Sequence, residues 1–435
     1  MFSNKNRTNK DRMDLLDTKP RICFFIQMAF GTAFAYLTSG VYLSGLAMLM
    51  NAGDVVISYL SIIVNICGVL ILLFAPFLER FKSRKRLTIG LTVLSRLFTF
   101  FIVMIPAFVP AKIQLAIFLP TVVLAFTLQA QTTVVLNQWM MGFIEEKRSG
   151  RYISLRQTLA LVVTVILSVT GGYWMDFMQG KYTGFVILFA VAGIMGGCEI
   201  VLLVRTPDSE LYQPSNRCGS LKDMIRFPLK NKSFAGFVFY VFAFYLILYI
   251  GDSYTMVYMM KYLALPYSTV TILYMIIALP QIFILGIWGK LSDKYGHEFV
   301  LKISIWLFVG ETIFMFFASS QTWFIFIPVA FFVSSVANAG FVISVFNRRY
   351  ELMPEDNRIV YDNFYTAAIG LGFIFGPMIG GSIKGLLETG NLIPDVMEYM
   401  SIRCLYLISA IGIVILQIIY LYKQKKRKEE ANVNY

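Results

Sequence analysis

Three polar side chains recur at helical spacing inside an otherwise apolar stretch, and they could bind a solute by hydrogen bonding. Gln129, Thr133 and Asn137 stand four residues apart, so a helix places all three on one face. Their amide and hydroxyl groups both donate and accept hydrogen bonds without carrying charge. Such a stripe can recognise the hydroxyl groups of a polar solute. The alternative is hydrogen bonding between neighbouring helices.

Ionisable side chains inside apolar stretches are the second group of candidates. A charge in the core of a bilayer is costly, so each such residue is a functional hypothesis until a partner is known. Those weighed as functional candidates are Arg96, Glu199, Asp252 and Glu311. We expect Glu199 to reach water, because it lies near the end of its apolar stretch.

Chemistry that needs histidine or clustered cysteine is excluded. His297 is the only histidine, and the five cysteines are scattered, most of them inside apolar stretches. Neither a G-x-S-x-G nor an H-E-x-x-H pattern occurs. We therefore expect no enzyme activity, no cofactor and no metal site, and a polytopic membrane enzyme remains a remote alternative.

The elements that must position these residues are membrane-spanning helices. Of the 435 residues, 57% are hydrophobic and 14% are charged, whereas soluble proteins have about 45 to 50% and about 25%. A helix crosses the bilayer with about 20 apolar residues, and the composition predicts an all-α polytopic membrane protein. The twelve predicted spans are 22–50, 55–78, 87–109, 113–141, 153–175, 184–204, 235–259, 269–288, 299–318, 324–346, 362–384 and 401–422.

Basic residues predict the orientation, because loops rich in Lys and Arg stay on the cytoplasmic side. With twelve spans, most of the 38 basic residues fall on the side of both tails and of the central loop; these include Arg156, which we assign to the loop 142–156. Both termini are therefore predicted to be cytoplasmic, in a multi-pass protein of the cell membrane. A cleavable signal peptide is disfavoured, because the first apolar run continues to Met50.

The net charge of +13 follows from the same topology. Basic loops are attracted to the anionic lipids of the inner leaflet, so the charge does not indicate nucleic-acid binding. We expect a small-molecule substrate, possible coupling to protons, and a monomer.

The two halves of the chain resemble each other at a shift of about 210 residues. Asn, an acidic pair and Arg recur at identical spacing in 137–148 and in 347–358. Six spans, a basic loop and six further spans are the predicted organisation. The predicted parts are a tail (1–21), an N-terminal bundle (22–204), a central loop (205–233), a C-terminal bundle (234–422) and a second tail (423–435).

The loop after the eighth span carries a family signature. It reads Gly289-Lys-Leu-Ser-Asp293-Lys294-Tyr-Gly296, which resembles the G-x-L-x-D-R/K-x-G motif of the major facilitator superfamily. With twelve spans in two repeats, the resemblance covers nearly the whole chain. The first-half copy, around Glu79-Arg80 and Arg84, is degenerate, because it lacks the leading glycine and has Glu in place of Asp.

The resemblance implies that the two halves rock about a central site. An acidic side chain at a helix end, beside basic residues, makes a latch that can break and form again; the alternative is a solvated charged loop that serves only topology. The gating residues implied are Glu79, Arg80, Arg84, Arg148, Gly289, Asp293, Lys294, Gly296 and Arg358.

Spans 1, 4, 7 and 10 line the central cavity in this superfamily. Asp252, on the seventh span, is thereby the coupling candidate for a proton or cation, with a structural acceptor as the alternative. Arg96 and Glu311 lie on peripheral spans, where a structural ion pair or a snorkelling chain is expected. The substrate-cavity candidates are Tyr36, Asn65, Gln129, Thr133, Asn137, Tyr249, Asp252, Gln281 and Asn338.

Amides, hydroxyls and aromatic rings suit a small polar solute such as a sugar, because rings stack on its apolar faces and amides read its hydroxyl groups. We therefore expect a secondary active or facilitative transporter that works by alternating access. A proton-coupled exporter of amphipathic compounds or drugs is the alternative, and a transport-dead sensor is a remote one. The small residues between Gly372 and Gly381 are expected to serve helix packing.

Overall fold

The computed structural model describes residues 18–70, 74, 78, 81, 83–144, 149–208, 221–354, 358–389 and 400–433. Within these ranges the chain is helical and has no β-strand. Its helices form two compact units, one of residues 1–52 and 70–218 and the other of residues 53–69 and 219–435. Residues 53–69, in the predicted second span, therefore belong with the C-terminal half of the chain.

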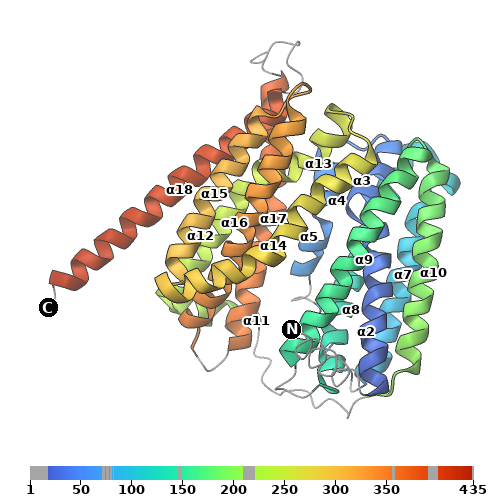
Figure 1. Ribbon diagram of the computed structural model, residues 1–435, viewed down its shortest axis with the longest axis horizontal. Coiled ribbons are helices and arrows are strands. Elements are labelled where there is room, and N and C mark those ends of the chain that lie inside the picture. Colours follow the sequence, from blue (N-terminus) through green and yellow to red (C-terminus); the bar gives the residue numbers. More distant parts are fainter. Residues whose placement is uncertain are drawn as a thin grey trace, which may run out of the picture. The chain divides into compact units, whose positions relative to one another are not determined.

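The first unit is a bundle of long helices, coloured blue to green in Figure 1. Its central helix α2 packs against α9 and α10, while α7 packs against α8 and α10. The predicted first span is broken into α2 and α3. The elements are α2 (Lys19–Leu37), α3 (Gly40–Leu49), α7 (Arg84–Phe108), η2 (Ala111–Ile113), α8 (Gln114–Met141), α9 (Ser149–Phe177) and α10 (Tyr182–Arg205).

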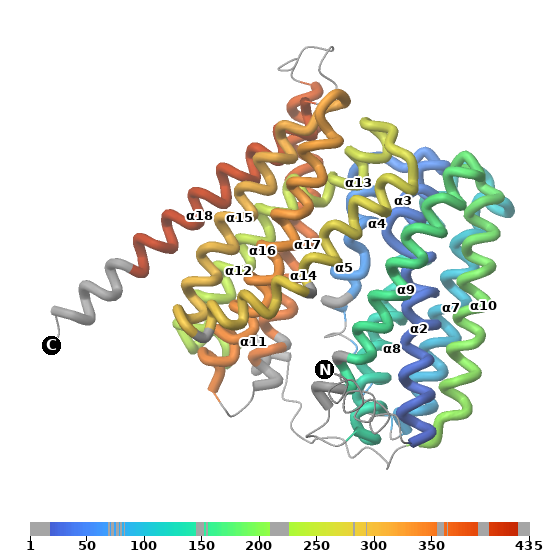
Figure 2. Tube along the Cα trace, viewed as in Figure 1, coloured from blue at the N-terminus to red at the C-terminus, as the bar shows by residue number. Residues whose placement is uncertain are grey.

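The second unit is built around α12, α16 and α17. The C-terminal helix α18, red in Figure 2, packs along α12 and α15, and the short helices α4 and α5 pack against α17. The elements are α4 (Asp54–Ser61), α5 (Ile63–Val69), α11 (Leu221–Lys230), α12 (Lys232–Gly251), η4 (Asp252–Tyr254), α13 (Thr255–Val257), η5 (Tyr258–Tyr262), α14 (Tyr267–Tyr295), α15 (His297–Phe317), α16 (Trp323–Leu352), α17 (Arg358–Thr389) and α18 (Met400–Val433).

The described helices agree with the predicted spans except at the first, second and eighth spans and in the central loop. Ten described helices are long and apolar enough to cross a membrane, and α14, which bends after Gln281 and contains Pro280, makes an eleventh. The second predicted span is described only as α4 and α5 and a few residues after them. The predicted central loop contains a helix, α11, which packs against α17.

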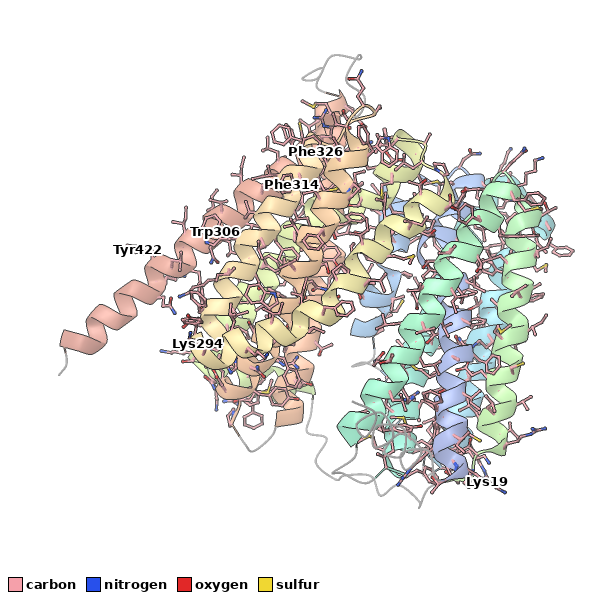
Figure 3. All side chains as sticks on the ribbon, viewed as in Figure 1. Lys19, Lys294, Trp306, Phe314, Phe326 and Tyr422 are labelled. Atoms are coloured by element: carbon pink, nitrogen blue, oxygen red, sulfur yellow. The ribbon has the colours of Figure 1, made fainter. Side chains whose placement is uncertain are left out.

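Large apolar side chains cover the outside of both units. Phe108, Phe177 and Phe283 are each about four-fifths exposed, and Trp306 and Tyr422 project from α15 and α18 (Figure 3). In water such a surface would be costly, whereas lipid tails match it.

Small residues allow α17 to lie directly against α12. A Cβ atom at Gly376 would come within 3.0 Å of the carbonyl oxygen of Leu246, and one at Gly380 within 2.4 Å of the carbonyl oxygen of Ile250. No side chain fits at the second distance without moving the backbone. The packing role expected for the small residues of this span is therefore what the structure shows.

We expect Gly380→Ala to destabilise the second unit by about 1–3 kcal/mol, because overpacking forces the two backbones apart. Gly385→Ala, in the same helix, is the matched control, since a Cβ atom there meets nothing within 4 Å. Thermal unfolding of the purified protein in detergent checks both variants. Equal melting temperatures would show that this contact is not tight.

Candidate substrate site

The first unit contains a partly open cavity of about 430 Å³ between α2, α7, α8, α9 and α10. This volume lies within the range of pockets that hold small ligands, about 300 to 1,000 Å³. Ten of its seventeen lining residues have side chains that can hydrogen-bond, although apolar groups make up most of the lining surface. The polar lining residues are Gln27, Thr32, Arg96, Gln129, Thr132, Thr133, Asn137, Arg156, Gln157 and Glu199.

The predicted stripe on α8 faces this cavity. Gln129, Thr133 and Asn137 all line it, on consecutive turns of one helix. The Thr133 hydroxyl donates a hydrogen bond to the backbone carbonyl of Gln129 at 3.1 Å, so its lone pairs stay available. The prediction that the three residues share one face is confirmed.

A buried ion pair closes the side of the cavity formed by α7 and α10. Arg96 donates from Nη2 and Nε to the same carboxylate oxygen of Glu199, at 2.6 and 3.2 Å. The Arg96 guanidinium also lies over the ring of Phe34, 3.8 Å from its centroid. The structural pair expected for Arg96 is therefore present. The expectation that Glu199 reaches water is wrong, because its side chain is only 2% exposed.

Gln27 connects this pair to α9. Its amide nitrogen donates to the second Glu199 oxygen at 2.7 Å, and its amide oxygen accepts from Nη2 of Arg156 at 3.3 Å. Gln27 thus uses both ends of its amide between two charged residues. It lies in the first apolar run, so the rule that selected Gln129 would also have selected it.

Two glycines make room for the ion pair. A Cβ atom at Gly31 would lie 2.8 Å from a Glu199 oxygen, and one at Gly196 would lie 3.2 Å from Cδ of Arg96. Larger residues there would push these side chains apart. The absence of a side chain therefore lets α2, α7 and α10 approach closely enough for the ion pair to form.

The observed position of Arg156 differs from the predicted one. It was assigned to a basic loop, but α9 begins at Ser149, and Arg156 lies inside that helix with 6% exposure. The sulfur atoms of Met28 and Met140 are its other contacts, and its Nε has no hydrogen-bond partner among the described residues. The error arose because Arg156, near the start of the predicted span 153–175, was counted with the basic residues of the loop before it.

The other cavity candidates lie elsewhere. Tyr36, on α2, bonds through its hydroxyl to Ser168 of α9 at 2.6 Å and is not among the residues that line the cavity. Tyr249, Gln281 and Asn338 belong to the second unit, on α12, α14 and α16. Asn65, on α5, is exposed and also belongs to the second unit. The role of all five in substrate binding stays a prediction.

Two carboxylates lie close together in the second unit. Asp252, where α12 ends, interacts electrostatically with Glu311 of α15, and Ser334 of α16 lies beside Glu311. Glu311 is 5% exposed and its Oε2 has no hydrogen-bond partner in the described part of the chain. Neither carboxylate forms an ion pair with a described basic residue, so the structural pair or snorkelling chain expected for Glu311 is not observed.

A second charged cluster joins α4 to η5 and α17. Asp54 accepts from Lys261 and from the Tyr262 hydroxyl, both at 2.6 Å, and lies 3.0 Å from Nζ of Lys384. Lys384 also pairs with Glu388 at 2.6 Å. Burial acts to raise the pKa of the Asp54 carboxyl, but these hydrogen bonds outweigh it and hold that pKa below its ordinary value.

The predicted gating residues are described only in part. Gly296 has φ +86°, a left-handed conformation that suits glycine, and it ends α14 one residue before α15 begins. Gly289 lies inside α14, Lys294 near its end, and buried Arg84 donates to the carbonyl of Leu78. Glu79, Arg80 and Arg148 lie outside the described residues, as do the side chains of Asp293 and Arg358.

Among the described residues, His, Cys, Asp and Glu form no group of three that could hold a metal ion. The site is therefore described by hydrogen bonds, charge and shape.

Several solved structures of transporters share this fold. NupG, a nucleoside transporter, aligns with a TM-score of 0.69 and 12% identity over 92% of this chain and 99% of that one. A D-xylose–proton symporter aligns with a TM-score of 0.65 and 12% identity over 92% and 96% of the two chains. A POT family transporter in complex with 5-aminolevulinic acid aligns with a TM-score of 0.69 and 11% identity over 93% and 96%.

Sequence comparison agrees with the resemblance carried by the loop motif. The class H tetracycline resistance protein of Pasteurella multocida is 29% identical over 172 residues, which span 39% of this chain and only 38% of that protein. A sequence profile of the Major Facilitator Superfamily matches residues 28–305 and 253–434. The chain therefore belongs to the Major Facilitator Superfamily and is a multi-pass transporter of the cell membrane.

Proposed function

We propose that the chain carries a small polar solute across the membrane, and that this solute binds in the cavity of the first unit. The observation that supports this most directly is the set of amides, hydroxyls, two guanidinium groups and one carboxylate that line this cavity of about 430 Å³. Uncharged hydrogen-bonding groups read hydroxyl or amide groups of a ligand, and the aliphatic lining fits its apolar faces. A sugar or a related metabolite has this mixture of groups.

The named relatives offer support of a weaker kind. A nucleoside transporter and a D-xylose–proton symporter share the fold, and the solutes in their names are small and rich in hydroxyl groups. At 12% identity their substrates do not transfer to this chain.

Export of amphipathic compounds is the second candidate function. The similarity to a tetracycline resistance protein favours it, and so do the methionine side chains of the lining, Met28, Met140 and Met141. Flexible thioethers adapt to ligands of different shape, whereas the polar stripe on α8 favours one pattern of hydroxyl groups.

The transport cycle proposed is alternating access. The latch residues named above, of which Asp293 and Lys294 belong to the better preserved motif, would gate the cytoplasmic side, where both termini lie in this proposal. The protein would work as a monomer, with its basic loops at an anionic leaflet, and it would move solute without covalent chemistry.

Proton coupling is proposed at Asp252. Its electrostatic neighbour Glu311 is a second buried carboxylate, and repulsion between two carboxylates favours protonation of one of them. A proton taken up on one side of the membrane could then be released on the other.

Thermal stabilisation of the purified protein tests the solute class. The panel contains sugars, nucleosides, amino acids and amphipathic cations, and a ligand at 100 times its Kd adds about 2.7 kcal/mol. A shift produced by a small polar solute, followed by counterflow of that solute in liposomes, supports the first proposal. Shifts produced only by amphipathic cations support the exporter.

Gln129→Ala and Thr133→Val should each weaken solute binding about three- to tenfold, because each removes a neutral hydrogen-bonding group from the cavity. Thr121→Val is the matched control: Thr121 lies on the same helix and donates to the carbonyl of Ile117 in the same way, but it does not line the cavity. Equilibrium binding of the solute found in the screen provides the measurement. Equal losses of binding affinity in all three variants would show that the stripe serves helix packing and not solute binding.

Asp252→Asn should abolish solute accumulation driven by a pH gradient while exchange of solute across the membrane continues, because an amide does not bind the proton. Glu298→Gln is the control, since the amide still accepts the hydrogen bond that Tyr420 donates to Glu298. Proteoliposomes with an imposed pH gradient allow both measurements. Normal accumulation in Asp252→Asn would place the coupling elsewhere.

A further inference from the structure

The charges around the cavity of the first unit do not balance. Its ionisable lining residues are Arg96, Arg156 and Glu199, so two positive charges accompany one negative charge. Both Glu199 oxygens are already engaged, one by Arg96 and the other by Gln27. Arg156 is therefore left without a carboxylate partner among the described residues.

We propose that Arg156 binds a carboxylate group of the transported solute. The inference rests on the proposed function, because it names the chemical class of solute for the same cavity. It narrows the expected substrate from a neutral polar solute to a small polar acid.

Burial makes the missing counter-ion significant. Arg156 is only 6% exposed. Its contacts are a Gln27 amide oxygen and the sulfur atoms of Met28 and Met140. Thioethers are weak acceptors and none of the three carries charge. A ligand that supplies a negative charge therefore stabilises an arginine buried among such groups.

The geometry of the guanidinium points to a carboxylate in particular. Nε has no hydrogen-bond partner in the described part of the chain, and Nη2 contacts only uncharged acceptors, the amide oxygen of Gln27 at 3.3 Å and the sulfur of Met28 at 3.5 Å. These two nitrogens form one edge of the planar guanidinium, and such an edge holds both oxygens of a carboxylate by parallel hydrogen bonds. Nη1, which contacts Met140, lies outside this edge.

The charge count favours a single negative charge on the solute. Arg96 also has a buried nitrogen without a partner, Nη1, but Glu199 already neutralises its charge. One carboxylate brings the cavity to neutrality, whereas a phosphate monoester would leave an excess negative charge in a buried site. The stripe of Gln129, Thr133 and Asn137 remains to bind the uncharged polar part of the solute.

The test compares acids with their neutral counterparts. The probes are glucuronate with glucose, galacturonate with galactose, N-acetylalanine with N-acetylalaninamide, and glucose 6-phosphate as the dianion. Binding is read from the thermal shift and from counterflow in liposomes. We expect at least one carboxylate to bind at least tenfold more tightly than its neutral counterpart and than the phosphate.

Variants of Arg156 locate the effect. Arg156→Gln should weaken binding of that acid about 10- to 100-fold, and Arg156→Lys, which keeps the charge but not the planar edge, should restore part of it. Arg205→Gln removes one positive charge from an exposed position at the end of α10 and should leave binding unchanged.

The stability of the ligand-free protein separates a binding role from a structural one. Arg156→Met removes the charge but keeps much of the volume. It should raise the melting temperature of the ligand-free protein, because the variant no longer has to bury a charge without a counter-ion. A structural arginine would give the opposite sign, and a lower melting temperature would overturn the proposal.

Failure of the inference differs from failure of the proposed function. Binding of neutral sugars equal to that of acids, or unchanged acid binding in Arg156→Gln, overturns the carboxylate site while the polar-solute transporter stands. Preference for the phosphate also overturns it. If neither acids nor neutral polar solutes bind, and only amphipathic cations do, both the inference and the proposed function fail.

Discussion

The buried ion pair between Arg96 and Glu199 is the interaction on which the first unit depends. Burying two charges costs several kcal/mol for each ion, and losing one partner costs about 3–5 kcal/mol because the other charge is then left alone. The pair joins α7 to α10, and Gln27 extends it to α2 and, through Arg156, to α9. One polar chain thus spans four helices, and the cavity lies along it.

Close contact between helices is what makes such a polar chain possible in a lipid environment. Where lipid surrounds the helices, apolar surfaces gain little from meeting each other, and packing and hydrogen bonds hold them together. Glycine supplies the necessary space beside Glu199, at Gly31, and between α12 and α17, at Gly380. In both units, glycine therefore lies where a neighbouring helix or a buried ion pair comes closest to the backbone.

The fold could be predicted from the sequence, and the site only in part. Run lengths of apolar residues and the loop from Gly289 to Gly296 were sufficient for the fold, because bilayer thickness constrains helix length strictly. The face shared by Gln129, Thr133 and Asn137 followed from helical periodicity. Arg156 and Glu199 were misjudged because distance along the chain from a loop does not say whether a neighbouring helix covers a side chain.

Which partner a buried charge finds is a property of three-dimensional packing. Arg96 and Glu199 are 103 residues apart, and Gln27 and Glu199 are 172 apart. Asp252 and Glu311 likewise come from different elements, η4 and α15. Spacing within one helix carries no information on such pairs, which is why the first-unit network and the second-unit carboxylates appeared only in the structure.

The membership of residues 53–69 in the second unit has a consequence for how the chain assembles. Tyr59 donates a hydrogen bond to the backbone carbonyl of Ile374, 315 residues later, and Asp54 meets Lys261, 207 residues later. During synthesis, α4 and α5 emerge early, but the elements they pack against, η4, α13 and α17, are made much later. Until then these two short helices lack their final neighbours, so the order of translation delays completion of the second unit and the two halves do not mature as independent domains.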